Sequence, residues 1–79
     1  MKAVMFTGNN GNTLKVEPDF SEAHAGDAGM VRIQISGADV DTQDEVFDAQ
    51  VYELFTPAEA REIARYFSEM ADRAEKGEA

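Results

Sequence analysis

Five carboxylates lie within ten residues, between positions 39 and 48, with no basic residue among them. The segment opens with Asp-x-Asp, like a calcium-binding loop, in which oxygen ligands recur at alternate positions. It then departs from such a loop, because Gln43 stands at the fifth position, Asp44 replaces the turn glycine and Gln50 replaces the bidentate glutamate. A calcium site is therefore disfavoured, and no other metal site is predicted. The acidic residues of the segment are Asp39, Asp41, Asp44, Glu45 and Asp48.

The negative charge of the chain is concentrated around this segment. Of the 79 residues, 16 are acidic and 7 are basic, which gives a net charge of −9. Residues 17–53 hold ten acids and a single base, Arg32, whereas residues 1–16 carry a charge of +2 and residues 54–79 a charge of −2. This balance argues against direct binding of nucleic acid, because phosphate contacts need clusters of Lys and Arg.

Two interpretations of the acidic residues remain open. In the first, they keep the protein soluble and prevent exposed strand edges from pairing with other chains. In the second, they form a recognition surface for a basic partner, since a surface that only solubilises usually mixes charges of both signs. Alternate residues of a strand lie about 6.5–7 Å apart, a spacing similar to that of successive phosphates on one nucleic-acid strand. This second interpretation predicts a DNA mimic, whose partner-binding residues are the five acids above together with Glu17 and Asp19.

Patterns typical of catalysis or cofactor binding are not found. The chain has no Cys and one His, so neither a thiolate metal site nor a paired-imidazole site can form. The histidine, His24, stands in a segment without periodicity, where no nucleophile or carboxylate is predicted to be held against it. The glycines of residues 8–11 lack the spacing of a phosphate-binding loop and the Lys that follows one. We therefore predict a protein that is not an enzyme and uses no cofactor.

Strand patterns account for the first two thirds of the chain. Residues 2–7 and 13–17 flank a Gly-Asn-Asn-Gly turn and predict a hairpin over residues 1–17, which Pro18 ends. Residues 30–36 and 47–51 alternate between apolar and polar side chains and predict an antiparallel strand pair, joined by the acidic loop, within residues 30–55. Beyond Val51 the alternation loses phase at Glu53, which predicts a bulge or the end of the strand.

The C-terminal third predicts one long helix, over residues 56–76. Thr56 and Glu59 form a capping-box pattern around Pro57, and Gly77 follows the last turn. An apolar stripe at three- and four-residue spacing is expected to cover the sheet. The predicted fold is therefore α+β, a single domain over residues 1–79 in which an antiparallel sheet of three to four strands carries one long C-terminal helix on one face. The stripe consists of Ala60, Ile63, Ala64, Phe67, Met70, Ala71 and Ala74.

Several aromatic and aliphatic residues near the junction of strand and helix are candidates for a partner contact. They are expected in the core or at its rim, and an exposed subset would offer a contact to a homodimer or to another protein. The chain is therefore expected to be a monomer or a homodimer. These residues are Tyr52, Leu54, Phe55, Tyr66 and Met70.

The ending of the chain, LFTPAEAREIARYFSEMADRAE over residues 54–75, resembles the strand followed by an alanine-rich helix that closes many short bacteriophage and mobile-element proteins. In size, acidity, lack of cysteine and sheet-plus-helix layout the whole chain is also similar to the small anti-CRISPR proteins, several of which mimic DNA against type I Cascade surveillance complexes. This second resemblance is one of general character, and those proteins share no motif from which residues could be carried over.

The resemblance implies a phage-encoded, non-enzymatic inhibitor of a type I CRISPR effector, acting in the cytoplasm of the host cell. Its partner would be a basic nucleic-acid-binding protein or Cascade-type complex. The alternative is a small acidic interaction or homo-oligomeric assembly module without nucleic-acid mimicry. No signal sequence or membrane span is predicted, because the longest apolar run near the N-terminus covers only residues 3–6.

Overall fold

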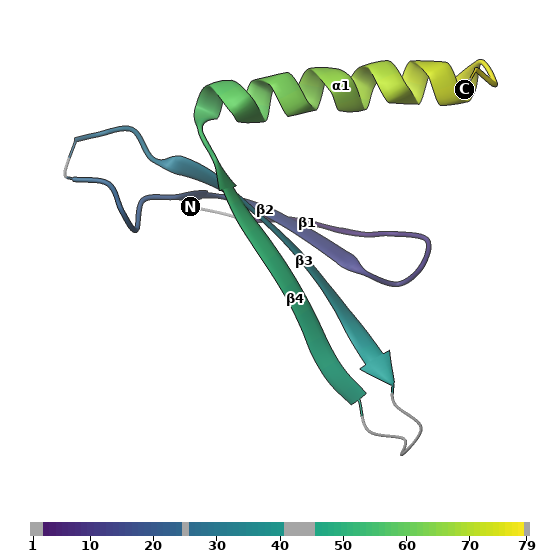
Figure 1. The fold of residues 1–79 in the computed structure, drawn as a ribbon, viewed down its shortest axis with the longest axis horizontal. Helices are drawn as coiled ribbons and strands as arrows, with labels where there is room; N and C mark the ends of the chain where they lie inside the picture. Colours follow the sequence, from purple (N-terminus) through teal and green to yellow (C-terminus); the bar gives the residue numbers. More distant parts are fainter. Residues whose placement is uncertain (1–2, 25, 41–45, 79) are drawn as a thin grey trace.

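The computed structural model describes residues 3–24, 26–40 and 46–78. Four strands form one antiparallel sheet in the order β1-β2-β3-β4, and a single helix follows the last strand (Figure 1). The predicted α+β fold is thereby confirmed. The elements are β1 (Val4–Thr7), β2 (Thr13–Asp19), β3 (Met30–Val40), β4 (Val46–Phe55) and α1 (Pro57–Glu75).

The N-terminal hairpin forms as the turn residues predict. β1 pairs with β2 from Val4 opposite Val16 to Thr7 opposite Thr13. The turn closes through a hydrogen bond from Gly8 N to Asn12 O of 2.8 Å, and Gly11 has a φ of 86°, which favours glycine.

Three predicted strand boundaries are wrong. β3 continues past Ser36 to Val40, into the predicted acidic loop. β2 continues through Pro18 to Asp19. Within the described residues β1 pairs with β2 no further than Val16, so no described strand needs an N–H from Pro18 on that side, and a proline is tolerated there. β4 continues without a bulge to Phe55, with a regular register against β3. Glu53 lies opposite Ile33 in this register and is exposed, so its carboxylate is not buried in an apolar core.

The helix begins with the predicted capping box. Thr56 is the only residue between β4 and α1; its hydroxyl accepts a 3.1 Å hydrogen bond from Glu59 N, and Glu59 Oε1 accepts a 2.9 Å hydrogen bond from Thr56 N. The helix ends at Glu75, and Gly77 follows with a φ of 73°. Because the connection is so short, the cap sets the direction in which the helix leaves the sheet.

Strand alternation divides the sheet into two faces. We call the face that carries Leu14, Ile33 and Val51 the apolar face, and the opposite one, with Lys15, Arg32 and Gln34, the polar face. The helix lies on the side of the apolar face, as predicted, but it stands apart from it (Figure 1). No residue in the described part of the chain is buried. The closed core that the sequence predicts is therefore not formed within one chain.

Candidate binding surfaces: an acidic arm and an apolar groove

The polar face is occupied by side chains that contact one another. Glu17 lies opposite Arg32, whose Nη1 donates to Glu17 Oε1 at 3.3 Å, and Lys15 Nζ lies 3.5 Å from the same oxygen. The Arg32 guanidinium also lies 4.6 Å from the centroid of the Tyr52 ring, in cation–π geometry. Two cations thus compensate the charge of Glu17, one of the predicted partner-binding acids.

Neutral hydrogen bonds continue this pattern along the polar face. Gln34 Nε2 donates to Gln50 Oε1 at 3.0 Å across β3 and β4, and to Ser36 Oγ at 3.2 Å along β3. These bonds satisfy polar groups of neighbouring strands within the chain.

Asp19, a second predicted partner-binding acid, closes the end of β2. Its Oδ1 accepts a 2.8 Å hydrogen bond from Ser21 N. Hydrogen bonds from the side chain and backbone of Ser21 hold the pKa of Asp19 below its usual value. Asp19 is therefore ionised at neutral pH, but it lies at the opposite end of β3 from the acidic segment, opposite Met30.

The acidic segment overlaps with a two-stranded projection, which consists of residues 37–40 of β3 and 46–50 of β4 in the described part of the chain. We call the sequence from 37 to 50 the acidic arm. β2 pairs with β3 only as far as Ser36, opposite Thr13, whereas β3 and β4 pair on to Val40 opposite Val46. In the described residues of the arm, β3 and β4 therefore pair only with each other, and the arm leaves the body of the sheet (Figure 1). At its base, the side chain of Asn12 occupies the place that a Cβ at Gly37 would need.

The register separates two of the predicted acids. Ala38 pairs with Asp48 and Asp39 pairs with Phe47, so these two acids occupy successive register positions. Successive positions of a strand belong to opposite faces of the sheet, so the arm has an acidic position on each face. The remaining three, Asp41, Asp44 and Glu45, lie outside the described residues.

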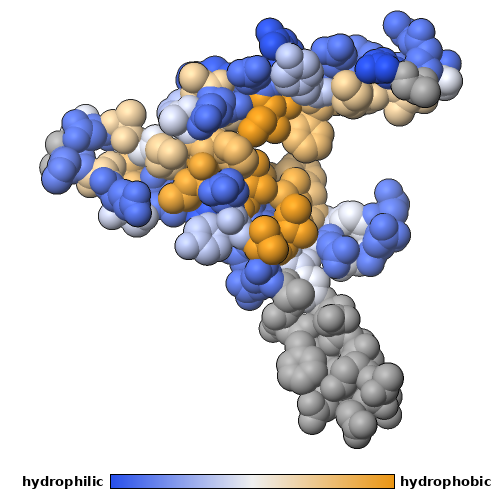
Figure 2. Space-filling model, in the orientation of Figure 1, coloured by the Kyte–Doolittle hydropathy of each residue, from blue (hydrophilic) through white to orange (hydrophobic). Residues whose placement is uncertain are grey.

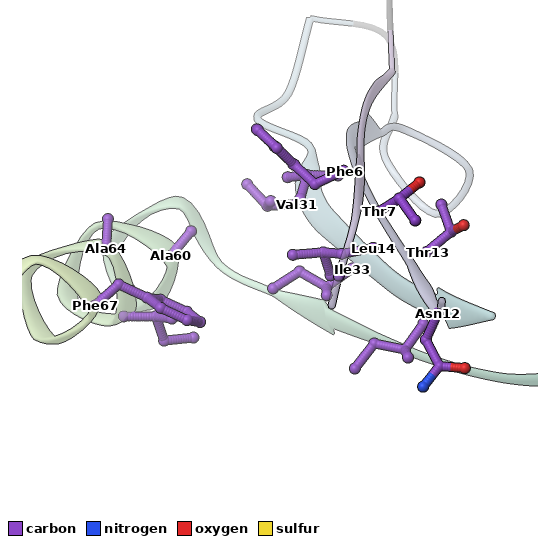
Figure 3. Close-up of a pocket in the computed structure, with 14 residues that line it drawn as sticks. Phe6, Thr7, Asn12, Thr13, Leu14, Val31, Ile33, Ala60, Ala64 and Phe67 are labelled. Atoms are coloured by element: carbon purple, nitrogen blue, oxygen red, sulfur yellow. The ribbon is translucent and has the colours of Figure 1, made fainter. Parts of the chain in front are cut away.

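An apolar groove lies between the helix and the sheet. It has a volume of about 570 Å³, and in Figure 3 the Phe67 ring of α1 points toward the strand residues across an open space, with Ala60 and Ala64 on the same part of the helix. Hydrophobic residues gather at this place on the surface of the molecule (Figure 2). The lining holds no charged residue and consists of Phe6, Thr7, Gly8, Asn12, Thr13, Leu14, Val16, Val31, Ile33, Ile35, Ala60, Ile63, Ala64 and Phe67.

Large side chains of the groove are left open to solvent. Phe6 is 60% exposed, Phe67 is 67% exposed and Ile35 is 52% exposed. Residues of this size and hydrophobicity are normally covered in a folded protein. The periodicity of strand and helix assigned Ile35 and Phe67 to covered faces, so sequence reasoning missed the groove. The sequence did predict exposed apolar residues, and Tyr52 is 61%, Met70 50% and Tyr66 46% exposed, but none of these three lines the groove.

The described residues show few features typical of a catalytic or metal-binding site. No group of three or more His, Asp or Glu side chains lies close enough together in the described part of the chain to hold a metal ion. His24 is exposed in the β2–β3 connection. Within the described ranges, no helix has the length and the apolar character needed to cross a membrane. The two candidate binding surfaces are therefore the acidic arm, which can bind a partner through charge, and the groove, which can bind one through apolar contact.

Comparisons with protein families, with curated proteins and with solved structures find no match to this chain.

Proposed function

We propose that this protein is a non-enzymatic inhibitor that occupies a basic, nucleic-acid-binding surface of a host complex through its acidic arm. The observation that carries the proposal is the arm itself, a two-stranded ribbon that extends past β2. Its residues include five acids and no base. The polar face of the sheet is a weaker candidate, because Glu17 already contacts Lys15 and Arg32.

The shape of the arm suits a groove better than a flat surface. A two-stranded ribbon is narrow, since neighbouring strands lie about 4.8 Å apart, and register gives it acidic positions on both faces. A channel that holds a nucleic-acid strand presents Lys and Arg from several sides. Association of such a pair is electrostatically steered and weakens as salt is added.

The specific target that we propose is a type I CRISPR effector, with the inhibitor acting in the host cytoplasm. Support for this choice comes from the resemblance in size, acidity and layout to small anti-CRISPR proteins. The mode of action would be steric and electrostatic, with the arm in the place of DNA, so no residue is assigned a catalytic role.

The test compares two variants of equal charge. In the arm variant, all five acids of the arm are changed to Asn or Gln; in the control variant, which we call the helix variant, four acids of the helix and Glu78, which follows it, are changed in the same way. Both raise the net charge by five, so non-specific electrostatics change equally. Each is tested for blocking DNA binding by a purified Cascade-type complex, and for capture of nucleic-acid-binding proteins from nuclease-treated lysate. The control positions are Glu62, Glu69, Asp72, Glu75 and Glu78.

The expected result is that the native chain and the helix variant compete with duplex DNA for the same protein, whereas the arm variant does not. Inhibition should decrease steeply as ionic strength rises. Equal inhibition by both variants would refute the role of the arm. Inhibition by none of the three chains would remove the type I effector as target, and the lysate capture would then test other basic proteins.

A second candidate function is an interaction module that binds a protein partner by apolar contact, with its charge serving solubility. The open groove favours this alternative, because its lining is apolar and uncharged. Binding of this kind persists at high salt, and duplex DNA does not compete with it.

A further inference from the structure

We propose that the apolar groove is filled by a second copy of this chain, in a twofold symmetric homodimer. In this dimer the helix of each copy covers the exposed part of the other copy's apolar face. The proposal does not depend on the acidic arm or on its target. It rests on the surface area of the chain, on the matching of its two exposed apolar surfaces, and on the position of its charges.

The exposed area is too large for a folded monomer of this mass. The chain exposes 6669 Å². A compact protein of the same 8.7 kDa exposes about 4,700 Å², so each chain has an excess of about 1,950 Å². The radius of gyration, 16.1 Å, likewise exceeds the roughly 12 Å expected for a compact chain of this length.

The excess area fits what a homodimer buries. Over two chains it amounts to about 3,900 Å², within the range of obligate homodimers. Part of it belongs to the arm, but even half of it, about 1,950 Å², lies within the range of a specific protein interface of standard size. Since no described residue is buried in the single chain, the interface would also supply the missing core.

Each chain exposes two apolar surfaces, one on the sheet and one on the helix, that do not contact each other within the chain. On the sheet, Val4 is 52% and Phe6 is 60% exposed, at the β1 edge of the apolar face. On the helix, the lining of the groove ends at Phe67, whereas the apolar stripe continues to Met70 and Ala74, which are exposed. A twofold contact pairs the helix surface of one copy with the sheet surface of the other, twice. A foreign partner would have to supply both surfaces, whereas a second copy has both.

The distribution of charge permits this contact. Two chains of net charge −9 repel each other, but the groove lining contains no charged residue, so its burial desolvates no ion. The described residues of the arm, 37–40 and 46–50, project away from the helix (Figure 1), and Asp39 and Asp48 are among them. We therefore expect the dimer to tighten as salt is added, because screening reduces the repulsion and leaves apolar contact in place.

The first experiment is sedimentation equilibrium of the native chain over a range of concentrations. The expected result is a mass of twice the chain, with a thermal midpoint that rises with protein concentration. A single-chain mass at every concentration would overturn the proposal, and would mean that the helix closes on its own sheet or that a different protein fills the groove.

Two helix variants separate a dimer contact from a general effect on folding. Met70→Glu places a charge on the stripe beyond the groove, at a position that is half exposed in the single chain and covered in the proposed dimer. Ser68→Glu adds the same charge two residues away, off the stripe. We expect Met70→Glu to raise the dimer dissociation constant on the order of a hundredfold, and Ser68→Glu to change it less than about threefold. Equal effects of the two variants would count against the proposed interface.

Cysteine crosslinking tests the orientation without relying on stability. The chain has no cysteine, so Val4→Cys and Met70→Cys each introduce a single thiol. When the two variants are mixed and oxidised, the proposed contact predicts a disulfide between unlike chains in excess over the like-chain products. A thiol at Ser68 in place of position 70 is the control. A random distribution of products from both mixtures would contradict the pairing of helix with partner sheet.

Discussion

The two faces of the sheet are made by the same strands, yet their side chains are satisfied in different ways. On the polar face, Arg32 contacts both Glu17 and Tyr52, and Gln34 contacts Gln50. On the apolar face, Phe6 and Ile35 remain more than half exposed beneath the helix. Hydrogen bonds and ion pairs need one partner, which the neighbouring strand provides. Apolar surface needs continuous cover, which a short chain with one distant helix does not provide.

The largest expected effect separates the two faces at adjacent residues. Ile33→Ser, on the apolar face, should lower the free energy of unfolding by about 2–3 kcal/mol, because it removes apolar area from the groove. Gln34→Ser, on the polar face, loses side-chain hydrogen bonds and should cost only about 0.5 kcal/mol. Urea unfolding of both variants at one fixed protein concentration measures the difference. Similar losses of unfolding free energy in the two variants would mean that both faces contribute equally to stability.

The next effect tests the end of the apolar face. A Cβ at Gly29 would lie 2.6 Å from a Phe20 ring carbon and 2.8 Å from Asp19 O, so Gly29→Ala must displace both. We expect a loss of about 1–2 kcal/mol in thermal or urea unfolding. Gly8→Ala is the matched control, since its Cβ would meet only Asn12 O at 3.7 Å, an ordinary contact. If Gly29→Ala unfolds like the native protein, the Phe20 ring and the Asp19 carbonyl can shift without a cost in free energy.

A third prediction concerns the connection that directs the helix over the apolar face. Thr56→Ala removes the hydroxyl that accepts from Glu59 N and should cost about 1 kcal/mol in unfolding free energy. Thr56→Ser keeps the hydroxyl and should restore most of that loss. If Ser behaves like Ala, the hydroxyl does not stabilise the helix.

A smaller effect is expected on the polar face. Arg32→Gln removes the ion pair with Glu17 and the contact with Tyr52, and should cost about 0.5 kcal/mol at low salt. Lys15 stays beside Glu17 and limits the loss. Arg61→Gln removes the same charge from the exposed part of the helix. The difference in unfolding free energy between the two variants should decrease in 1 M NaCl. A difference that persists at high salt would show that Arg32 stabilises the protein by packing and not by charge.

The smallest effect is a pH dependence at the helix start. Hydrogen bonds from the backbone and side chain of Thr56 hold the pKa of Glu59 below its usual value. The folded state thus favours the carboxylate, so its contribution is complete above the usual glutamate pKa and is lost as the pH falls through the lowered one. In acid titrations followed by circular dichroism, native protein should lose stability relative to Glu59→Gln in that window. If the two proteins lose stability in parallel as the pH falls, the folded state does not favour the Glu59 carboxylate.

The sequence predicted the local structure well because local signals decide it. The turn glycines place the β1–β2 hairpin, and the Thr56–Glu59 pair places the start of the helix. It failed at Pro18 and Glu53, where the outcome depends on what lies beside the strand. Pro18 continues β2 beyond the last described pair with β1, and Glu53 continues β4 because the apolar face is open there.

The candidate surfaces were only partly foreseeable. Charge density located the acidic segment, but the relation of Asp39 to Asp48 follows from the β3–β4 register. The groove could not be foreseen, because periodicity identifies the residues that need cover and does not name what covers them.

The sequence by itself determined the type of each element, the faces of the strand segments that alternate regularly, and the part of the chain that carries the charge. These depend on neighbours a few residues apart, through side-chain alternation, capping and turn chemistry. The tertiary structure alone decided that β3 and β4 extend past β2 to make an arm, and that α1 stands away from the sheet to leave a groove. The physical reason is that the hydrophobic effect has no direction: it requires that Phe6 and Phe67 be covered, and it is equally satisfied by the same chain or by another.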